Sequence, residues 1–233
     1  VRKMEMSIKI ITPYVFENDI KGHKQQFWEY DVYYERDAAA IGCDLMFQKM
    51  WNQFPDDDIF ILHADMAPHH DGWFEEVLEY VEKYPEAGMF GCLLLYPAKN
   101  ESDEYFVQCA GGKFTDNKPD HFGSGLILEN KQAFKQELET DTGQYDSTRS
   151  VAWTTFGGCD LRREFINSVG DFDPSFEWTY NRDVDYCLSG RQNGFDIYQI
   201  PVRLFHHESR DTKRIRNDSK SAMESRNLER LQT

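Results

Sequence analysis

Four consecutive apolar residues, Ile59-Phe-Ile-Leu62, lie between the acidic stretch Asp56-Asp-Asp58 and the triplet His63-Ala-Asp65. A strand that is apolar at every position is covered on both faces, which is the usual situation in a parallel sheet. The run Gly88-Met-Phe-Gly-Cys-Leu-Leu-Leu95 has the same character, and so does the β-branched run Ser7-Ile-Lys-Ile-Ile-Thr12. These runs predict strands at the centre of a sheet.

Segments with helical spacing separate the strands. Residues 38–54 repeat Ile41 and Leu45 at a helical interval after a strand expected at 30–34, and residues 73–84 carry a longer apolar stripe. The alternation of strand, helix and strand predicts an α/β fold with a wound, mostly parallel sheet flanked by helices. In such sheets, ligands bind at the carboxyl ends of the strands.

The length of 233 residues favours a single domain. We expect this domain to span residues 1–209, and the charged residues 210–233 to form a tail, a lid or a linker. Residues 97–150 are polar and contain glycine, so we expect irregular loops over the sheet with short strands at 106–109 and 126–128.

The balance of charge argues against some partners. The chain carries 26 Lys and Arg against 41 Asp and Glu, a formal net charge of -15 that repels nucleic acid. Its five cysteines are widely spaced and form no CxxC pair, which favours a reducing, cytoplasmic location. No apolar run approaches the roughly 20 residues needed to cross a bilayer, so we expect no transmembrane segment.

The triplet His63-Ala-Asp65 stands at the end of an apolar strand, where a ligand is expected. A carboxylate and an imidazole are both suitable ligands for Mn²⁺, whereas Mg²⁺ prefers oxygen alone. The alternative is that Asp65 caps the next helix, and the triplet alone does not decide between the two.

Two further pairs could carry chemistry. Asp183 and Asp185 lie at an expected helix start, where carboxylates at i and i+2 face different directions, so that one can point into a cleft. Taken alone, a solvated acidic helix start is the simpler explanation. His206 and His207 follow an apolar strand and could supply a metal ligand, although a histidine is more often a surface or core residue.

The order of these and other short motifs along the chain is more specific than any one of them. The motifs are Ile59 to Asp65, Pro68 to Trp73, Gly91-Cys-Leu-Leu-Leu-Tyr-Pro97, Ala110-Gly-Gly112, His121-Phe-Gly-Ser-Gly125, Gly157-Gly-Cys-Asp-Leu-Arg-Arg-Glu164, Gly170 to Phe176, Asp183 to Cys187 and His206-His207. The series resembles the GT-A glycosyltransferases of family 2, especially the rhamnosyltransferase-like members of bacteria and viruses, from Ile8 to Ser209. The sequence departs from that pattern at His63, where the family usually has aspartate, and at Arg182, where it usually has glutamate.

The resemblance implies an inverting glycosyltransferase that moves a sugar from a UDP- or dTDP-linked donor to a carbohydrate acceptor. It implies Mn²⁺ (or Mg²⁺) on the donor diphosphate, bound by Asp65 and by His206 or His207. Asp183 matches the general base of the family, and Asp185 is the alternative carboxylate for that role.

The resemblance also places residues around the nucleotide sugar. After the first strand, Thr12, Tyr14 and Glu17 would meet the nucleotide base, and Asp44 in the following helix would lie near the nucleoside. His63 and Asp65 would lie at the diphosphate. The sugar and the acceptor would lie near Trp153, Gly157 and Gly158. An aromatic ring at such a position is equally often plain core.

Two other functions compete with a transferase. The first is a catalytically silent module that binds nucleotide sugar or glycan, although such a module has no need of a base. The second is a sugar nucleotidylyltransferase, which normally has a glycine-rich phosphate loop after the first strand. Thr12-Pro-Tyr-Val-Phe-Glu17 contains no glycine, so this second alternative ranks below the others.

Overall fold

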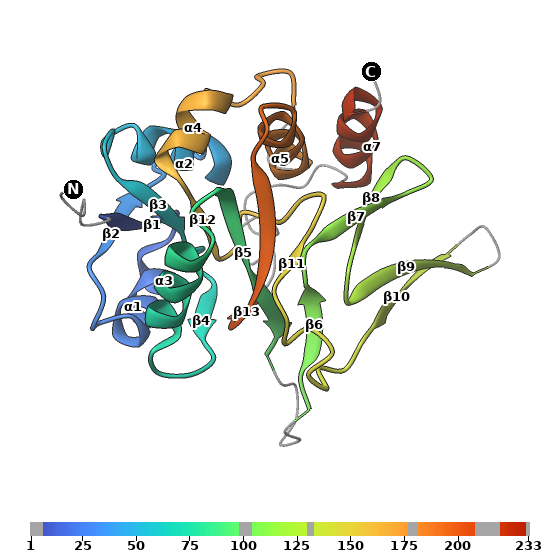
Figure 1. Cartoon of the computed structure of the whole chain (residues 1–233), viewed down its shortest axis with the longest axis horizontal. Helices are drawn as coiled ribbons and strands as arrows, with labels where there is room; N and C mark the ends of the chain where they lie inside the picture. Colours follow the sequence, from blue (N-terminus) through green and yellow to red (C-terminus); the bar gives the residue numbers. More distant parts are fainter. Residues whose placement is uncertain (1–6, 98–103, 130–132, 177–180, 208–219, 232–233) are drawn as a thin grey trace.

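A mixed sheet forms the centre of the computed structural model, which describes residues 7–97, 104–129, 133–176, 181–207 and 220–231. The strand order is β11-β13-β5-β12-β3-β1-β2 (Figure 1). The strands are β1 (Ile8–Tyr14), β2 (Val32–Arg36), β3 (Asp58–Ile61), β5 (Ala87–Tyr96), β11 (Arg149–Ser150), β12 (Cys159–Leu161) and β13 (Asp196–His206). Two short strands extend the sheet: β4 (Met66–Pro68) pairs with β13, and β6 (Phe106–Cys109) pairs with β5.

The main strands point the same way. β1 is parallel to β2 and β3, and β5 is parallel to β13. β12 lies between β3 and β5 and is antiparallel to both, which gives those two a common direction. The carboxyl ends of β1, β2, β3, β5 and β13 therefore meet at one edge. The expected α/β fold is confirmed, with β4, β6, β11 and β12 making the sheet mixed.

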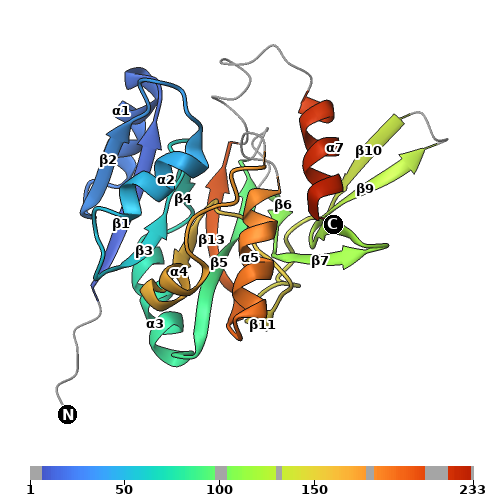
Figure 2. The ribbon, with the colours of Figure 1, turned by 90° about the horizontal axis from the view of Figure 1, so that it is seen from above.

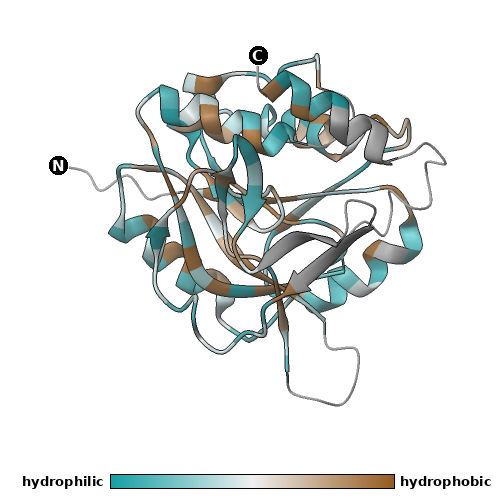
Figure 3. Ribbon diagram, turned by 90° about the vertical axis from the view of Figure 1, so that its right-hand side faces the viewer, coloured by the Kyte–Doolittle hydropathy of each residue, from teal (hydrophilic) through white to brown (hydrophobic). Residues whose placement is uncertain are grey.

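Helices cover both faces of the sheet. They are α1 (Glu17–Gln26), α2 (Cys43–Trp51), α3 (Trp73–Lys83), α4 (Arg163–Val169) and α5 (Arg182–Gln192). In Figure 1, α2, α4 and α5 lie above the sheet and α1 and α3 below it; Figure 2 shows the upper layer from above. Figure 3 shows apolar, brown stretches on the central strands. Among the described residues, none of the helices is both long and apolar enough to cross a membrane.

Each face of the sheet has its own apolar cluster. The upper cluster includes Phe47 and Trp51 of α2 and Tyr186 of α5, and the lower one includes Trp73 and Val77 of α3. Strands that are buried on both faces need apolar side chains in both directions, which explains the unbroken runs in β3 and β5.

Helix α2 presents a different face to the core from the one that its sequence suggested. Ile41 and Leu45 are 41% and 38% exposed, whereas Met46, Phe47 and Met50 are buried. Ile41 lies before the helix, which begins at Cys43, so it does not share the helical period of the residues that follow.

The middle of the chain is more regular than we expected. It contains two antiparallel strand pairs, β7 (Gly112–Thr115) with β8 (Lys118–His121), and β9 (Ser124–Glu129) with β10 (Ala133–Leu138). The first pair turns through Asp116 and Asn117, whose φ angles of 50° and 60° suit a tight two-residue turn. The expectation of irregular loops was wrong here, while the short strands expected at 106–109 and 126–128 lie within β6 and β9.

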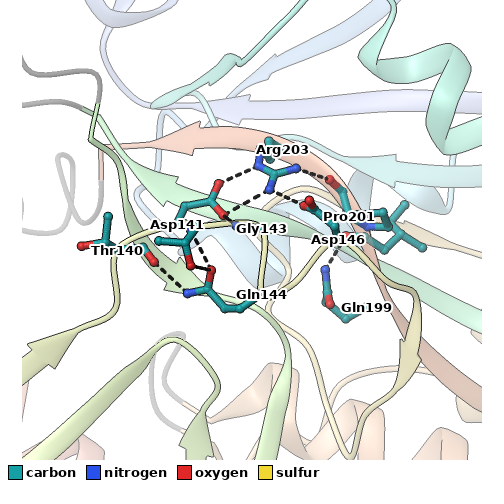
Figure 4. Close-up of polar contacts among 10 residues, drawn as sticks. Thr140, Asp141, Gly143, Gln144, Asp146, Gln199, Pro201 and Arg203 are labelled. Carbon is teal, nitrogen blue, oxygen red and sulfur yellow. Dashed lines mark hydrogen bonds and ion pairs between the residues drawn. The ribbon is translucent and has the colours of Figure 1, made fainter.

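A network around Arg203 ties the segment after β10 to the sheet (Figure 4). The Arg203 guanidinium on β13 contacts both oxygens of Asp141, at 2.7 and 3.1 Å, and one oxygen of Asp146 at 2.5 Å. Bidentate pairs of this kind are geometrically specific. The Arg203 network therefore fixes the approach of residues 141–146 to the last strand.

The C-terminal stretch includes a helix, α7 (Lys220–Leu231), that we did not expect. Figures 1 and 2 both show α7 between α5 and the strand pair β9–β10. Asn227 is fully buried and Leu231 packs against the upper apolar cluster, so this helix is part of the folded body. The predicted tail, lid or linker also includes residues 210–219, which lie outside the described residues, and the domain boundary stays a prediction.

Candidate metal and nucleotide-sugar site

The carboxyl edge of the sheet brings together residues that are remote in the sequence. After β3 the chain turns into β4, which is antiparallel to β13 with Met66 opposite His206. The backbone N–H of His207 donates to the carbonyl of Asp65 at 3.0 Å. This pairing places the triplet at 63–65 beside the end of the last strand.

Three side chains form a candidate metal site at this edge. His63, Asp65 and His206 each offer a ligand atom, and these atoms lie within 4.8 Å of one another. Asp65 Oδ1 is 3.3 Å from His206 Nε2, and the two imidazole rings have their centroids 5.3 Å apart. Two imidazoles and one carboxylate suit a divalent transition metal ion.

His63 is held as a neutral imidazole. Its ring stacks on Phe47 of α2, with centroids 5.4 Å apart, and its Nε2 is buried without a hydrogen-bond partner. Burial, and then the neighbouring His206, lower its pKa to about 4. A neutral imidazole with an unused buried nitrogen is the form that binds a metal ion, so this residue fits the site that its neighbours define.

Only one of the two adjacent histidines belongs to the cluster. His206 is the last residue of β13, whereas His207 follows the strand and its side chain is exposed. Successive side chains of a strand point to opposite faces, and Val202 and Leu204 share the face of His206. That alternation in the sequence could have separated the two histidines.

Gln108 completes the surroundings of His206 and was missed by the sequence analysis. It lies on β6 and is 8% exposed, and its Oε1 is 2.6 Å from His206 Nδ1. Its amide nitrogen lies 3.5 Å from the His206 backbone carbonyl. Nothing in the sequence marks this glutamine, because its role depends on the pairing of strands.

The two acids at the start of α5 have different neighbours. Asp183 Oδ1 accepts a hydrogen bond from the N–H of Val184 at 2.9 Å. Burial raises the pKa of Asp183 to about 6, and hydrogen bonds from backbone N–H groups oppose that rise. Asp185 is half-buried, and burial and then the nearby Asp173 raise its pKa. Asp183 and Asp185 therefore have different surroundings.

Asp44 lies in the first turn of α2 and interacts with the start of α5. Asp44 and Arg182 are each 4% exposed, and Asp44 Oδ2 lies 4.0 Å from Arg182 Nη1. Burial raises the pKa of Asp44 to about 8, the charge of Asp183 adds to the effect, and Arg182 opposes it. Buried Asp44 and Arg182, with the partly buried Asp183 nearby, therefore link the N-termini of α2 and α5.

Comparison with solved structures supports a GT-A-like fold for this chain. No protein-family model matches the chain. It is 28% identical, over 156 residues or 65% of its length, to the O-antigen biosynthesis protein RfbC of Myxococcus xanthus, of which it spans 11%. It is similar to the crystal structure of GalNAc-T7 with UDP, GalNAc and Mn²⁺, with a TM-score of 0.56, 11% identity, and coverage of 86% of this chain and 44% of that one. The fold is GT-A-like. The structure of A197 from STIV also matches, with a TM-score of 0.46, 12% identity, and coverage of 84% and 83%.

In this GT-A-like fold, the residues expected at the nucleotide base stand around the end of β1. Thr12 and Tyr14 belong to the strand itself and Glu17 begins α1, so the expected loop is shorter than we assumed. Thr12 is fully buried with its Oγ1 unpaired, while the Tyr14 hydroxyl donates to Glu17 Oε1 at 3.1 Å near the surface.

The residues expected near the sugar divide into two groups. Trp153 is 2% exposed, donates from Nε1 to the carbonyl of Lys113 at 3.1 Å, and belongs to the upper apolar cluster. Gly157 lies beside the metal cluster, and Gly158 lies against Leu204 and Met66, which are close to the metal cluster in the sequence. A Cβ on Gly157 would be 3.8 Å from the His206 ring, and one on Gly158, whose φ is +63°, would be 2.6 Å from Leu204.

Proposed function

We propose that this chain is a metal-dependent, inverting glycosyltransferase that moves a sugar from a UDP- or dTDP-linked donor to a carbohydrate hydroxyl. The observation that carries the proposal is the cluster of His63, Asp65 and His206 at the carboxyl edge of a GT-A-like sheet. Ligands of wound α/β sheets bind at that edge. The acids of α2 and α5 stand at the same end of the fold.

The cluster would hold Mn²⁺ (or Mg²⁺) with the donor. Such an ion, when bound, neutralises the charge that develops on the leaving diphosphate. His63 and His206 would supply imidazole nitrogens and Asp65 an oxygen. Gly157 lies beside the His206 ring, where the lack of a side chain keeps its backbone close to the cluster.

Asp183 would be the general base. It would accept the proton of the acceptor hydroxyl as that oxygen attacks the anomeric carbon, with inversion in a single displacement. A base works best when its pKa is near the working pH, and burial moves the pKa of Asp183 from 3.8 to about 6. The hydrogen bond from Val184 fixes its carboxylate in one orientation.

The known relatives support a carbohydrate substrate. GalNAc-T7 was solved with a nucleotide, a sugar and Mn²⁺, and RfbC is named for O-antigen biosynthesis. By this proposal, Thr12, Tyr14, Glu17 and Asp44 contribute to the nucleotide side of the donor site. A cytoplasmic location remains part of the proposal.

The test measures release of nucleoside diphosphate from a panel of UDP- and dTDP-sugars, with Mn²⁺ and a mixture of saccharide acceptors. Asp183→Asn is expected to bind the donor normally and to lose activity by about 10²- to 10⁴-fold, the usual contribution of a general base. Asp185→Asn should retain more activity than Asp183→Asn, and Asp171→Asn, an exposed acid near the same helix, serves as the control.

Two outcomes would overturn the proposal. Donor binding without turnover in the wild-type protein would favour the silent binding module. Loss of activity in Asp185→Asn, with Asp183→Asn active, would transfer the role of base to Asp185.

A further inference from the structure

We infer that Gln108 is a positioning residue that fixes His206 in the Nδ1–H tautomer and so makes the cluster select a transition metal ion over Mg²⁺. This inference rests on the metal site of the proposed function. It adds a residue that the glycosyltransferase resemblance did not indicate, and it concerns the choice of ion rather than turnover.

The placement of Gln108 follows from the sheet. β13 pairs along one side of β5, from Asp196 to Phe205, while β12 and β6 share the other side. Gln108 on β6 and His206 on β13 therefore face each other across β5. The side chain of Gln108 is buried, so its amide must find its hydrogen-bond partners within the protein.

Two contacts of the amide indicate which way it points. The His206 backbone carbonyl can only accept a hydrogen bond, so the amide N–H₂ must face it, at 3.5 Å. Oε1 then faces His206 Nδ1 at 2.6 Å. An amide oxygen is an acceptor, and Nδ1 must therefore carry the proton that it donates to Gln108.

The tautomer decides what the other ring nitrogen can do. With the proton on Nδ1, the lone pair of a neutral His206 is on Nε2, which lies 3.3 Å from Asp65 Oδ1. A lone pair and a carboxylate oxygen at this distance repel each other unless a proton or a metal ion stands between them. Two ligand atoms that share an ion at about 2.1 Å lie roughly 3.0–3.4 Å apart, so the spacing suits a shared ion.

The third ligand makes the set rich in nitrogen. His63 offers the cluster a second imidazole, and its buried Nε2 has no hydrogen-bond partner. Mg²⁺ prefers oxygen ligands and keeps most of its water, whereas Mn²⁺, Co²⁺ and Zn²⁺ accept imidazole. Two imidazoles therefore favour the transition ions, provided that Gln108 keeps the His206 lone pair aimed inward.

The experiment measures metal binding to the full chain without any donor, by calorimetry with Mn²⁺, Co²⁺ and Mg²⁺. We expect wild-type protein to bind Mn²⁺ and Co²⁺ at least about tenfold more tightly than Mg²⁺. Gln108→Leu should weaken Mn²⁺ and Co²⁺ binding by about 10- to 100-fold, as loss of the partner of a ligand histidine usually does. Gln108→Glu keeps the acceptor and should restore binding. Gln199→Leu replaces another buried glutamine of the sheet, on β13, and should leave binding unchanged.

A second measurement separates tautomer control from simple support of the fold. In metal-free protein at mildly alkaline pH, ¹⁵N NMR should show the His206 ring protonated at Nδ1, and Gln108→Leu should shift the ring toward the Nε2–H form. The visible spectrum of the Co²⁺ complex should also change in Gln108→Leu and not in Gln199→Leu.

Three results would overturn the inference: equal binding of Mg²⁺ and Mn²⁺ by the wild type, unchanged Mn²⁺ binding in Gln108→Leu, or an Nε2–H tautomer in the wild type. None of these results contradicts sugar transfer, which is measured by product formation. Conversely, a protein that binds Mn²⁺ as expected but never releases nucleoside diphosphate would refute the proposed function and leave the role of Gln108 intact.

Discussion

Replacing Asp44 by asparagine tests whether the fold keeps this acid protonated. The side chain is 4% exposed, and its Oδ2 has no hydrogen-bond partner. Burial, and then the charge of Asp183, raise its pKa from 3.8 to about 8. The Arg182 guanidinium, with Nη1 4.0 Å from Oδ2, offsets only part of this rise.

The sign of the pH dependence follows from proton binding. An acid whose pKa is higher in the folded chain holds more protons there, so the free energy of unfolding falls as the pH rises from 3.8 toward about 8. Each tenfold change in proton affinity is worth about 1.4 kcal/mol, so Asp44 lowers the free energy of unfolding by roughly 4–6 kcal/mol across that window. Asparagine has nearly the same shape and cannot ionise, so Asp44→Asn should lose this pH dependence.

Urea unfolding at a series of pH values through the window measures the effect. Asp44→Asn and the wild type should be of similar stability at the acidic end, and the variant should become the more stable protein as the pH rises. Asp171→Asn, which replaces an exposed aspartate, should follow the slope of the wild type. Parallel curves for Asp44→Asn and the wild type would mean that Asp44 is ionised in the folded protein, which refutes the reasoning.

Three shorter predictions concern the metal, the base and the Arg203 network. Mn²⁺ at about 100 times its Kd should stabilise the wild type by about 2.7 kcal/mol, or about 5–10 °C in Tm, and Asp65→Asn should lose this shift in a thermal scan; an undiminished shift would place the ion elsewhere. Because burial raises the pKa of Asp183 to about 6, kcat should fall with decreasing pH below about 6, and a profile that is flat through that value would argue against Asp183 as the base. Asp141→Asn should cost about 2–3 kcal/mol at neutral pH, because the Arg203 hydrogen bond lowers the pKa of Asp141 and stabilises its carboxylate. This difference in stability should shrink as the pH falls through the lowered pKa of Asp141. Chemical denaturation at two pH values measures it, and a difference that stays constant would contradict the prediction.

The central strands were predictable because an unbroken apolar run indicates burial on both faces of a sheet. Ile59 to Leu62 and Gly88 to Leu95 are apolar throughout, and both lie in strands covered on two faces. Helix α1 was not predicted, because Ile20 is the buried apolar residue of a segment that is otherwise polar. The strand pairs of the middle segment lack apolar alternation, and their clearest signal was Asp116-Asn117, which suits a tight turn.

For the site, the sequence could name types of residue but not their geometry. It indicated Asp65 and a histidine from the end of the chain, and the structure brings Asp65 and His206 together through the pairing of β4 with β13. It noted that the His63 imidazole suits Mn²⁺ but assigned the metal to Asp65 and to His206 or His207, which it treated as equivalent. Gln108 carried no signal, since a hydrogen bond across β5 depends on which strands are neighbours.

Asp44 and Asp183 show why composition cannot assign chemical roles to acids. Each lies in the first turn of a helix, where the helix dipole favours the ionised form. Asp183 also accepts the N–H of Val184, which limits the rise of its pKa to about 6, so that it is largely ionised at neutral pH. Asp44 is left with an unpaired buried oxygen, and its pKa of about 8 keeps most of it protonated there. Two acids whose surroundings move their pKa values apart can take different roles, one as a base and the other as a neutral hydrogen-bond donor. That separation comes from burial, from backbone hydrogen bonds to Asp183 and from the charges around Asp44, and none of these can be seen before the chain is folded.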